Sequence, residues 1–245
     1  MLKGVEDEAG TGRREAVAAA WDRVTREMAA LGYHLANPAA AHIVRMPIMG
    51  ASKFEGGTHL LFVSERAARS EMLAGLVAHE FSHMLLTERG HPSHDFDLLL
   101  AVARGVARDH ALRDGIGLLV EVEKHAQDIY ADDITLRVLG ADPAVGFFGS
   151  WIAGNLRALS GDRHANLLLW ATNCFALANL ERHGLADRAM DAYRDAAAFD
   201  LNAGFLSSDR LVTAYRNLPR SADRPLVSSA LRHVCELAAG EAAPR

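Results

Sequence analysis

The feature that most constrains this chain is a His-Glu-x-x-His string, His79 to His83, inside the apolar run Leu73–Leu86. Residues four apart project from one face of an α-helix, so both imidazoles can bind one metal ion. Glu80 lies close enough to activate a water molecule at that ion. The flanking residues are uncharged, as expected for a buried helix whose ionisable side chains serve a site. The string therefore predicts a catalytic metal site on a buried helix.

Composition argues against several classes of function. The net charge of -5, the pI near 6.2 and the lack of a basic stripe argue against a nucleic-acid surface. Two distant cysteines, Cys174 and Cys235, favour a reducing compartment over a disulfide framework. Residues 1–14 lack the basic start and apolar core of a signal peptide, so we expect a cytoplasmic protein. The apolar stretches 144–154 and 165–180 are too short to span a membrane and predict buried helices.

Periodicity and turn signals predict an α+β fold that is predominantly helical. Two strand-type segments, His42–Ile48 and Thr58–Val63, are expected to form the only sheet. Ser64 is expected to cap a helix that starts at Glu65 and runs through the His-Glu-x-x-His string, with room for a break within 68–71. Further helices are predicted over 13–31, 96–112, 118–139, 145–159, 164–183, 186–198, 208–218 and 224–239.

The segment Gly140–Pro143 is the predicted boundary between two parts of the chain. Residues 1–140 form the mixed part with the small sheet and the metal-binding helix, and residues 141–245 form an all-helical C-terminal part. Because the segment is short, we expect the helical part to pack on the mixed part as one body.

A catalytic zinc ion needs a third protein ligand and leaves one position to water. Four candidates recur at i, i+4, i+7 and i+11 in 120–135, which places them on one face of a helix: Glu121, His125, Asp128 and Asp132. Solvated helices also carry acidic stripes, but this helix has apolar positions that indicate a share in a core. His91 and His94 follow the metal-binding helix and could reach a metal from the next loop, but loop or turn roles are favoured for both.

The order of strand 58–63, HExxH helix and later acidic helix resembles the zincin metallopeptidases, especially the gluzincins. Within that group it is similar to the soluble catalytic domains related to CAAX prenyl proteases and heat-shock membrane peptidases. Their second helix carries Glu-x-x-x-Asp, and the matching segment here runs from Asp128 to Asp132. The resemblance covers about residues 46–138. It implies that Asp128 is the third zinc ligand and that Asp132 supports a histidine ligand.

The sequence departs from that pattern, because its motif begins with the shorter aspartate. Glu121, which has the same spacing to His125, is therefore an alternative ligand, and His125 itself is another because imidazole also suits zinc.

The predicted function is a zinc-dependent peptidase that hydrolyses peptide bonds with metal-activated water and Glu80 as general base. The resemblance to zincins implies that strand 58–63 receives a peptide or protein substrate as an added antiparallel strand. Phe54 and Gly56-Gly57 are expected to form a lip over the cleft. Tyr130 or His125 could donate to the oxyanion, although Tyr130 lies off the acidic face and is better explained as structural. The alternative is a zinc-binding helical regulatory or interaction protein whose zincin-like site has no turnover.

Overall fold

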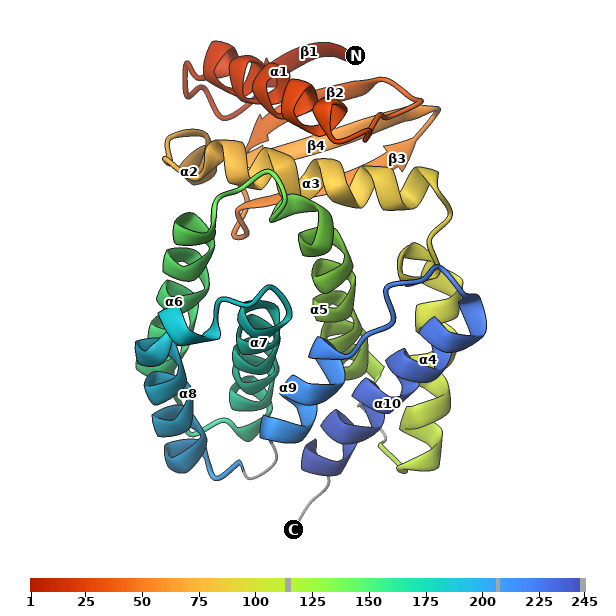
Figure 1. The fold of residues 1–245 in the computed structure, drawn as a ribbon, viewed down its shortest axis with the longest axis vertical. Coiled ribbons are helices and arrows are strands. Elements are labelled where there is room, and N and C mark those ends of the chain that lie inside the picture. The colour runs from red at the N-terminus through yellow and green to blue at the C-terminus, as the bar shows by residue number, and fades with distance from the viewer. Residues whose placement is uncertain (113–115, 206–207, 243–245) are drawn as a thin grey trace. The chain divides into compact units, whose positions relative to one another are not determined.

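The computed structural model describes residues 1–112, 116–205 and 208–242 (Figure 1). These residues are mostly helical and include one four-stranded sheet, which confirms the predicted α+β, predominantly helical class. The chain divides into two compact units. The first unit comprises Met1–His91 and Ile134–Leu139, and the second comprises Pro92–Asp133 and Gly140–Arg245.

The sheet of the first unit has the strand order β1-β2-β4-β3. Its strands are β1 (Leu2–Asp7), β2 (Ala39–Val44), β3 (Gly50–Glu55) and β4 (Thr58–Ser64). β2 pairs in parallel with β1 and β4, whereas β3 pairs antiparallel with β4. Buried side chains alternate along β2 and β4, so these two strands form the centre of the sheet and bury one face.

The prediction of a sheet with only two strands was wrong, because β1 and β3 were missed. Both are rich in small and charged residues and lack the apolar alternation that marks a strand. The predicted lip is the tip of the β3–β4 hairpin, where Gly56 and Gly57 adopt φ of 56° and 73°. Positive φ at both central residues suits the tight turns that join two antiparallel strands.

The prediction that β4 offers an open edge to a substrate was also wrong. β4 is hydrogen-bonded to β2 on one side and to β3 on the other, so its backbone groups are already paired. The edges of the sheet are β1 and β3. β3 is the antiparallel edge strand, and a Cβ on its Gly50 would lie only 2.8 Å from a methyl carbon of Leu76. The start of β3 therefore packs tightly against the helix that carries the histidines.

Three helices complete the first unit: α1 (Arg14–Ala30), α2 (Glu65–Ala68) and α3 (Leu73–Glu88). Ser64 caps α2 as predicted, because its Oγ accepts a hydrogen bond from the backbone N–H of Ala67. The predicted break between α2 and α3 is present. α1 and α3 pack together through Trp21 and Phe81, whose ring centroids lie 5.9 Å apart.

The second unit is built of helices: α4 (Phe96–Asp109), α5 (Ile116–Thr135, whose last two residues belong to the first unit), α6 (Ala141–Arg157), α7 (Arg163–Arg182), α8 (Met190–Ala203), α9 (Ser208–Arg216) and α10 (Arg224–Ala242). α6 starts four residues before the predicted Val145, since Pro143 lies in its first turn, where no N–H donor is needed. α8 starts at Met190, because the predicted start forms a separate 3-10 turn, Ala186–Arg188. None of the helices in the described residues is long and apolar enough to cross a membrane.

The division into these two compact units does not follow the predicted boundary at residue 140. Residues 92–133 belong with the C-terminal helices. Arg232 of α10 forms an ion pair with Asp109 at the end of α4, and Tyr215 of α9 donates its hydroxyl to the carbonyl of Val122 in α5. α4 and most of α5 therefore share a core with helices that follow them by about a hundred residues. The glycine and proline turn signals in the sequence do not indicate this long-range packing.

Glu123 of α5 is a buried acid that the sequence did not single out. Its side chain is 0% exposed within the helical core of the second unit. Burial raises the pKa of Glu123 to about 8 from its ordinary value of 4.5, and the thiol of Cys235 offsets this only in part. Glu123 is therefore held in its neutral form at neutral pH.

Replacing Glu123 by glutamine is expected to stabilise the protein more at pH 8 than at pH 5. The folded state keeps its proton up to about pH 8, whereas the unfolded chain releases it near 4.5. Stability is therefore fullest below pH 4.5 and falls as pH rises through this window, by up to about 1.4 kcal/mol per unit. Urea unfolding followed by circular dichroism at pH 5 and pH 8 measures the change. An equal difference between wild type and variant at both pH values would contradict it.

Candidate metal site

The HExxH string lies on α3, a helix of 16 residues that is apolar around most of its circumference. Fully buried side chains of α3 include Val77, Phe81 and Met84, and Phe81 packs against Trp21 of α1. α3 also packs against the segment after α5, since a Cβ at Gly75 would lie in ordinary contact with Leu139, 3.4 Å from a methyl carbon. The helix is therefore held on several sides, and its polar side chains have defined positions.

His79 and His83 point their ring nitrogens at each other. Their Nε2 atoms lie 3.0 Å apart, and the ring planes meet at 80°. Both side chains are half-buried. Two imidazoles on a tetrahedral zinc ion, with Zn–N distances of 2.0–2.1 Å, place their nitrogens about 3.3 Å apart. The observed pair is close to that separation, so the two histidines fit a shared zinc ion.

Glu80 follows the first histidine and is only 5% exposed. A carboxylate is costly to bury, and such burial is common where the group has a chemical role. Glu80 is attached to the same rigid turn of α3 as both histidines, so its backbone position relative to them is fixed. This is the arrangement that a general base beside a metal requires.

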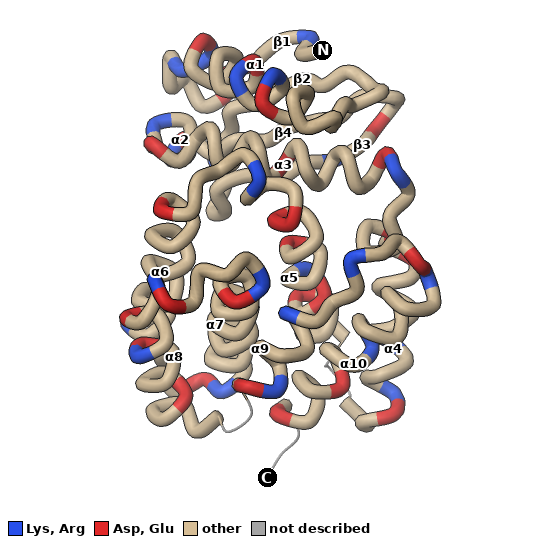
Figure 2. Tube along the Cα trace, viewed as in Figure 1, with Lys and Arg blue, Asp and Glu red and all other residues tan. Residues whose placement is uncertain are grey.

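Asp128 and Asp132, the other predicted ligand and its support, belong to the second unit. Figure 2 shows acidic residues recurring along α5. Asp128 is half-buried. Asp132 is 5% exposed and accepts a hydrogen bond of 2.9 Å from Nδ2 of Asn179 on α7. A buried carboxylate that accepts such a bond is held in one orientation, which suits a supporting role. The roles of both residues stay predictions.

The two alternative ligands have other interactions inside the second unit. Glu121 is exposed and forms an ion pair with Lys124. His125 stacks on Phe175 with a centroid distance of 5.3 Å, and its Nε2 lies 3.2 Å from Oγ1 of Thr172. Burial lowers the pKa of His125, which keeps its ring neutral. These contacts account for both residues without a metal, so Asp128 is the better candidate.

The remaining polar candidates occupy structural positions. Tyr130 is 4% exposed, and burial raises the pKa of its hydroxyl. His91 is buried, which lowers its pKa. His94 ends the 3-10 turn Pro92–His94, and its Nδ1 lies 2.8 Å from Oγ of Ser93. The turn roles predicted for both histidines agree with these positions.

A second metal-capable group lies on the sheet of the first unit. His42 on β2 has its Nδ1 3.0 Å from a carboxylate oxygen of Glu8 and 3.6 Å from one of Glu6. Both glutamates are exposed. Ion pairing of a histidine with exposed acids explains this group fully, so we assign no metal to it.

Sequence reasoning missed a buried pair at the end of α3. His59 of β4 is 1% exposed, and its Nε2 lies 2.9 Å from a carboxylate oxygen of Glu88. The same carboxylate accepts backbone hydrogen bonds from Ala36 and Asn37, each 2.7 Å long. The pair joins α3 to the central strand β4 and to the segment that leads into β2. No local pattern indicates it, because its partners lie far apart in the chain.

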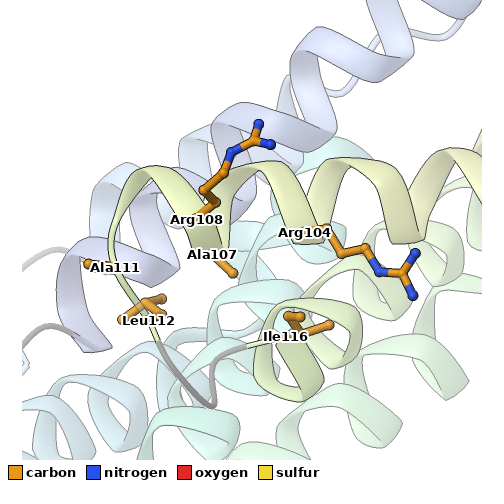
Figure 3. A pocket seen from close by; sticks show the side chains of 6 residues that line it. All are labelled: Arg104, Ala107, Arg108, Ala111, Leu112 and Ile116. Carbon is orange, nitrogen blue, oxygen red and sulfur yellow. The ribbon is translucent and has the colours of Figure 1, made fainter.

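A shallow pocket of about 360 Å³ lies in the second unit between the end of α4 and the start of α5 (Figure 3). It is lined by arginine and small or apolar residues: Arg104, Ala107, Arg108, Ala111, Leu112 and Ile116. None of the predicted site residues lines it, and Ile116 lies about 18 Å along α5 from Asp128. The pocket is therefore separate from the predicted ligand on that helix.

Comparison with known proteins places the chain in one family. Residues 15–238 match the family described as "Family of unknown function (DUF5781)". The chain is a member of the DUF5781 family. No curated protein and no solved structure matches it. The part that matches DUF5781 includes the whole of α3 and α5, so both halves of the predicted metal site lie within the family's own region.

Proposed function

We propose that this DUF5781 protein is a zinc-dependent peptidase in which His79, His83 and Asp128 bind zinc and Glu80 is the general base. The observation that carries the proposal is the pair of Nε2 atoms 3.0 Å apart on one helix turn, next to a buried glutamate. Two imidazoles and a carboxylate are a donor set that suits a zinc ion. Histidine and carboxylate ligands with one position left for water are typical of catalytic zinc.

A bound zinc ion would polarise the scissile carbonyl and lower the pKa of a water molecule toward neutrality. Glu80 would take the proton from the attacking water and then pass it to the leaving amine. A glutamate between the histidines has no purpose in a purely structural site. Its presence favours the enzyme over a regulatory protein without turnover.

We propose that an extended peptide pairs with β3 rather than with β4. β3 is an edge strand with one side free of strand partners in the described sheet, and its start packs against Leu76 of α3. Added strands are recognised through main-chain hydrogen bonds, which need little side-chain specificity. The proposed substrate class is therefore an extended segment of a peptide or protein. The buried free thiols Cys174 and Cys235 fit the reducing, cytoplasmic compartment that we propose.

The proposal predicts near-stoichiometric zinc in the purified protein. His83→Ala and Asp128→Ala should each weaken zinc binding by at least about 10-fold, because each removes a ligand. Glu121→Ala is the matched control on α5 and should leave the affinity unchanged. Metal analysis and competition with a chromophoric chelator measure both effects.

The outcomes separate the candidate functions. Zinc binding with cleavage of a broad peptide pool supports the peptidase. Zinc binding by wild type without cleavage of any pool would overturn it in favour of a regulatory zinc protein. A wild-type protein that holds no zinc after reconstitution rejects the metal site, and a loss of affinity in Glu121→Ala but not in Asp128→Ala moves the third ligand to Glu121.

A further inference from the structure

Ser82 of α3 and Thr135 of α5 form a buried pair of hydroxyl groups. Ser82 lies on α3 between the two histidines, and its Oγ is 3.0 Å from Oγ1 of Thr135, the last residue of α5. The two residues are 0% and 2% exposed. Ser82 Oγ is also 2.8 Å from the carbonyl oxygen of Ala78, so it is held on its own helix as well. A hydrogen bond between two such buried groups has a defined geometry, because water cannot replace either partner.

Thr135 and Asp128 are on the same face of the same helix. They are seven residues apart in the sequence, which is close to two turns and about 10 Å along the axis. A two-turn helical segment moves as a unit, so fixing the rotation and the position of α5 at Thr135 also fixes them at Asp128.

The rest of the final turns of α5 is also held in place. Asp132 accepts from Asn179, and both carboxylate oxygens of Asp133 accept from Arg182, at 2.7 and 2.6 Å. The Asp133–Arg182 pair is nearly buried, with the arginine side chain 3% exposed. These bonds hold α5 on α7 within the second unit. Thr135, by contrast, belongs to the first unit together with Ser82.

We propose that Thr135 is a positioning residue, whose hydrogen bond to Ser82 anchors the end of α5 and, through the continuous helix, supports Asp128 as a zinc ligand. This inference rests on the proposed function, since it assumes that Asp128 is a ligand. A purely structural pair would contribute stability alone. A positioning pair contributes zinc affinity that depends on Asp128.

The test removes the hydroxyl and keeps the shape. In the full chain, Thr135→Val should weaken zinc binding by about 10- to 100-fold, the effect typical of groups that orient a ligand. Thr135→Ser keeps the hydroxyl and should restore the affinity to within about threefold of wild type. Thr87→Val, at an exposed threonine of α3, is the matched control and should have no effect. The zinc dissociation constant is measured by chelator competition.

The decisive measurement repeats Thr135→Val in an Asp128→Ala background. If Thr135 acts through Asp128, the valine substitution costs no further affinity there, because interacting residues are not additive. The same fold-loss in both backgrounds overturns the inference, and so does unchanged affinity in Thr135→Val. If Thr135→Val does not fold, Ser82→Ala removes the same hydrogen bond by changing its partner on α3. Its zinc affinity is then measured in the wild-type and Asp128→Ala backgrounds, with the same expected and contradicting results. Failure of wild type to bind zinc is a different result, because it rejects the proposed function itself.

Discussion

Replacing Glu80 by glutamine is expected to lower the rate of peptide hydrolysis by about 10²- to 10⁴-fold while zinc remains bound. Glutamine keeps the size of the side chain at this buried position, which is 5% exposed in the wild type. It cannot accept and return a proton, so the general-base step is lost. The histidines are unchanged, so the metal should be held with an affinity within about twofold of wild type.

The matched control is Glu71→Gln, which makes the same change at an exposed glutamate just before α3. It should leave turnover and zinc content unchanged. Single-turnover cleavage of a peptide pool, together with zinc analysis of each sample, measures the two effects. Turnover in Glu80→Gln equal to that of the control would remove Glu80 from the mechanism, while loss of zinc in Glu80→Gln would assign it to metal binding instead.

The helix that carries the histidines could be predicted because its signals are local. The apolar run, the Ser64 cap and the four-residue spacing of the histidines all act within a few turns of one helix. The same holds for the helices of the second unit, whose ends fall within a few residues of the predicted ranges. Local signals therefore determined most of the helical fold.

The sheet could not be predicted in the same way. β1 and β3 take their strand conformation from neighbours, because their own residues show little alternation. β4 lies between β2 and β3 because it pairs in parallel with β2 as well as antiparallel with its hairpin partner β3. No residue pattern in β4 indicates the parallel pairing. This non-local pairing moves the proposed substrate edge from β4 to β3.

The long-range contacts of α3 were beyond sequence analysis for a related reason. Ser82 and Thr135 are 53 residues apart, and His59 and Glu88 are 29 apart. A serine in an apolar helix or a glutamate at a helix end has many ordinary explanations. Only the folded chain shows that each one meets a buried partner.

The second large effect is expected for Glu88→Ala, which should lower the stability of the first unit by about 1–3 kcal/mol. The substitution leaves the buried His59 without its acceptor and removes the acceptor of two backbone N–H groups, those of Ala36 and Asn37. Burial alone would raise the pKa of Glu88, but these hydrogen bonds outweigh it and lower the pKa. The folded state therefore favours the charged carboxylate.

The sign of the pH dependence follows from that lowered pKa. The stability contributed by the ionised carboxylate is present above the ordinary value of 4.5 and is lost as pH falls through the lower pKa of the folded state. The difference between wild type and Glu88→Ala should therefore be largest near neutral pH and should shrink at pH 3. Urea unfolding at both pH values measures this change.

Hydrogen exchange assigns the effect to the correct unit, because the two compact units need not unfold together. In Glu88→Ala, the amides of β2 and β4 should exchange faster, whereas those of α7 and α9 should be unaffected. Glu27→Ala is the control within the first unit, since Glu27 forms an exposed i,i+4 pair with Arg23 that is worth at most about 0.5 kcal/mol. Equal exchange of β4 in Glu88→Ala and Glu27→Ala would show that the buried pair does not hold α3 on the sheet, and the histidines would then owe their position to α3 packing alone.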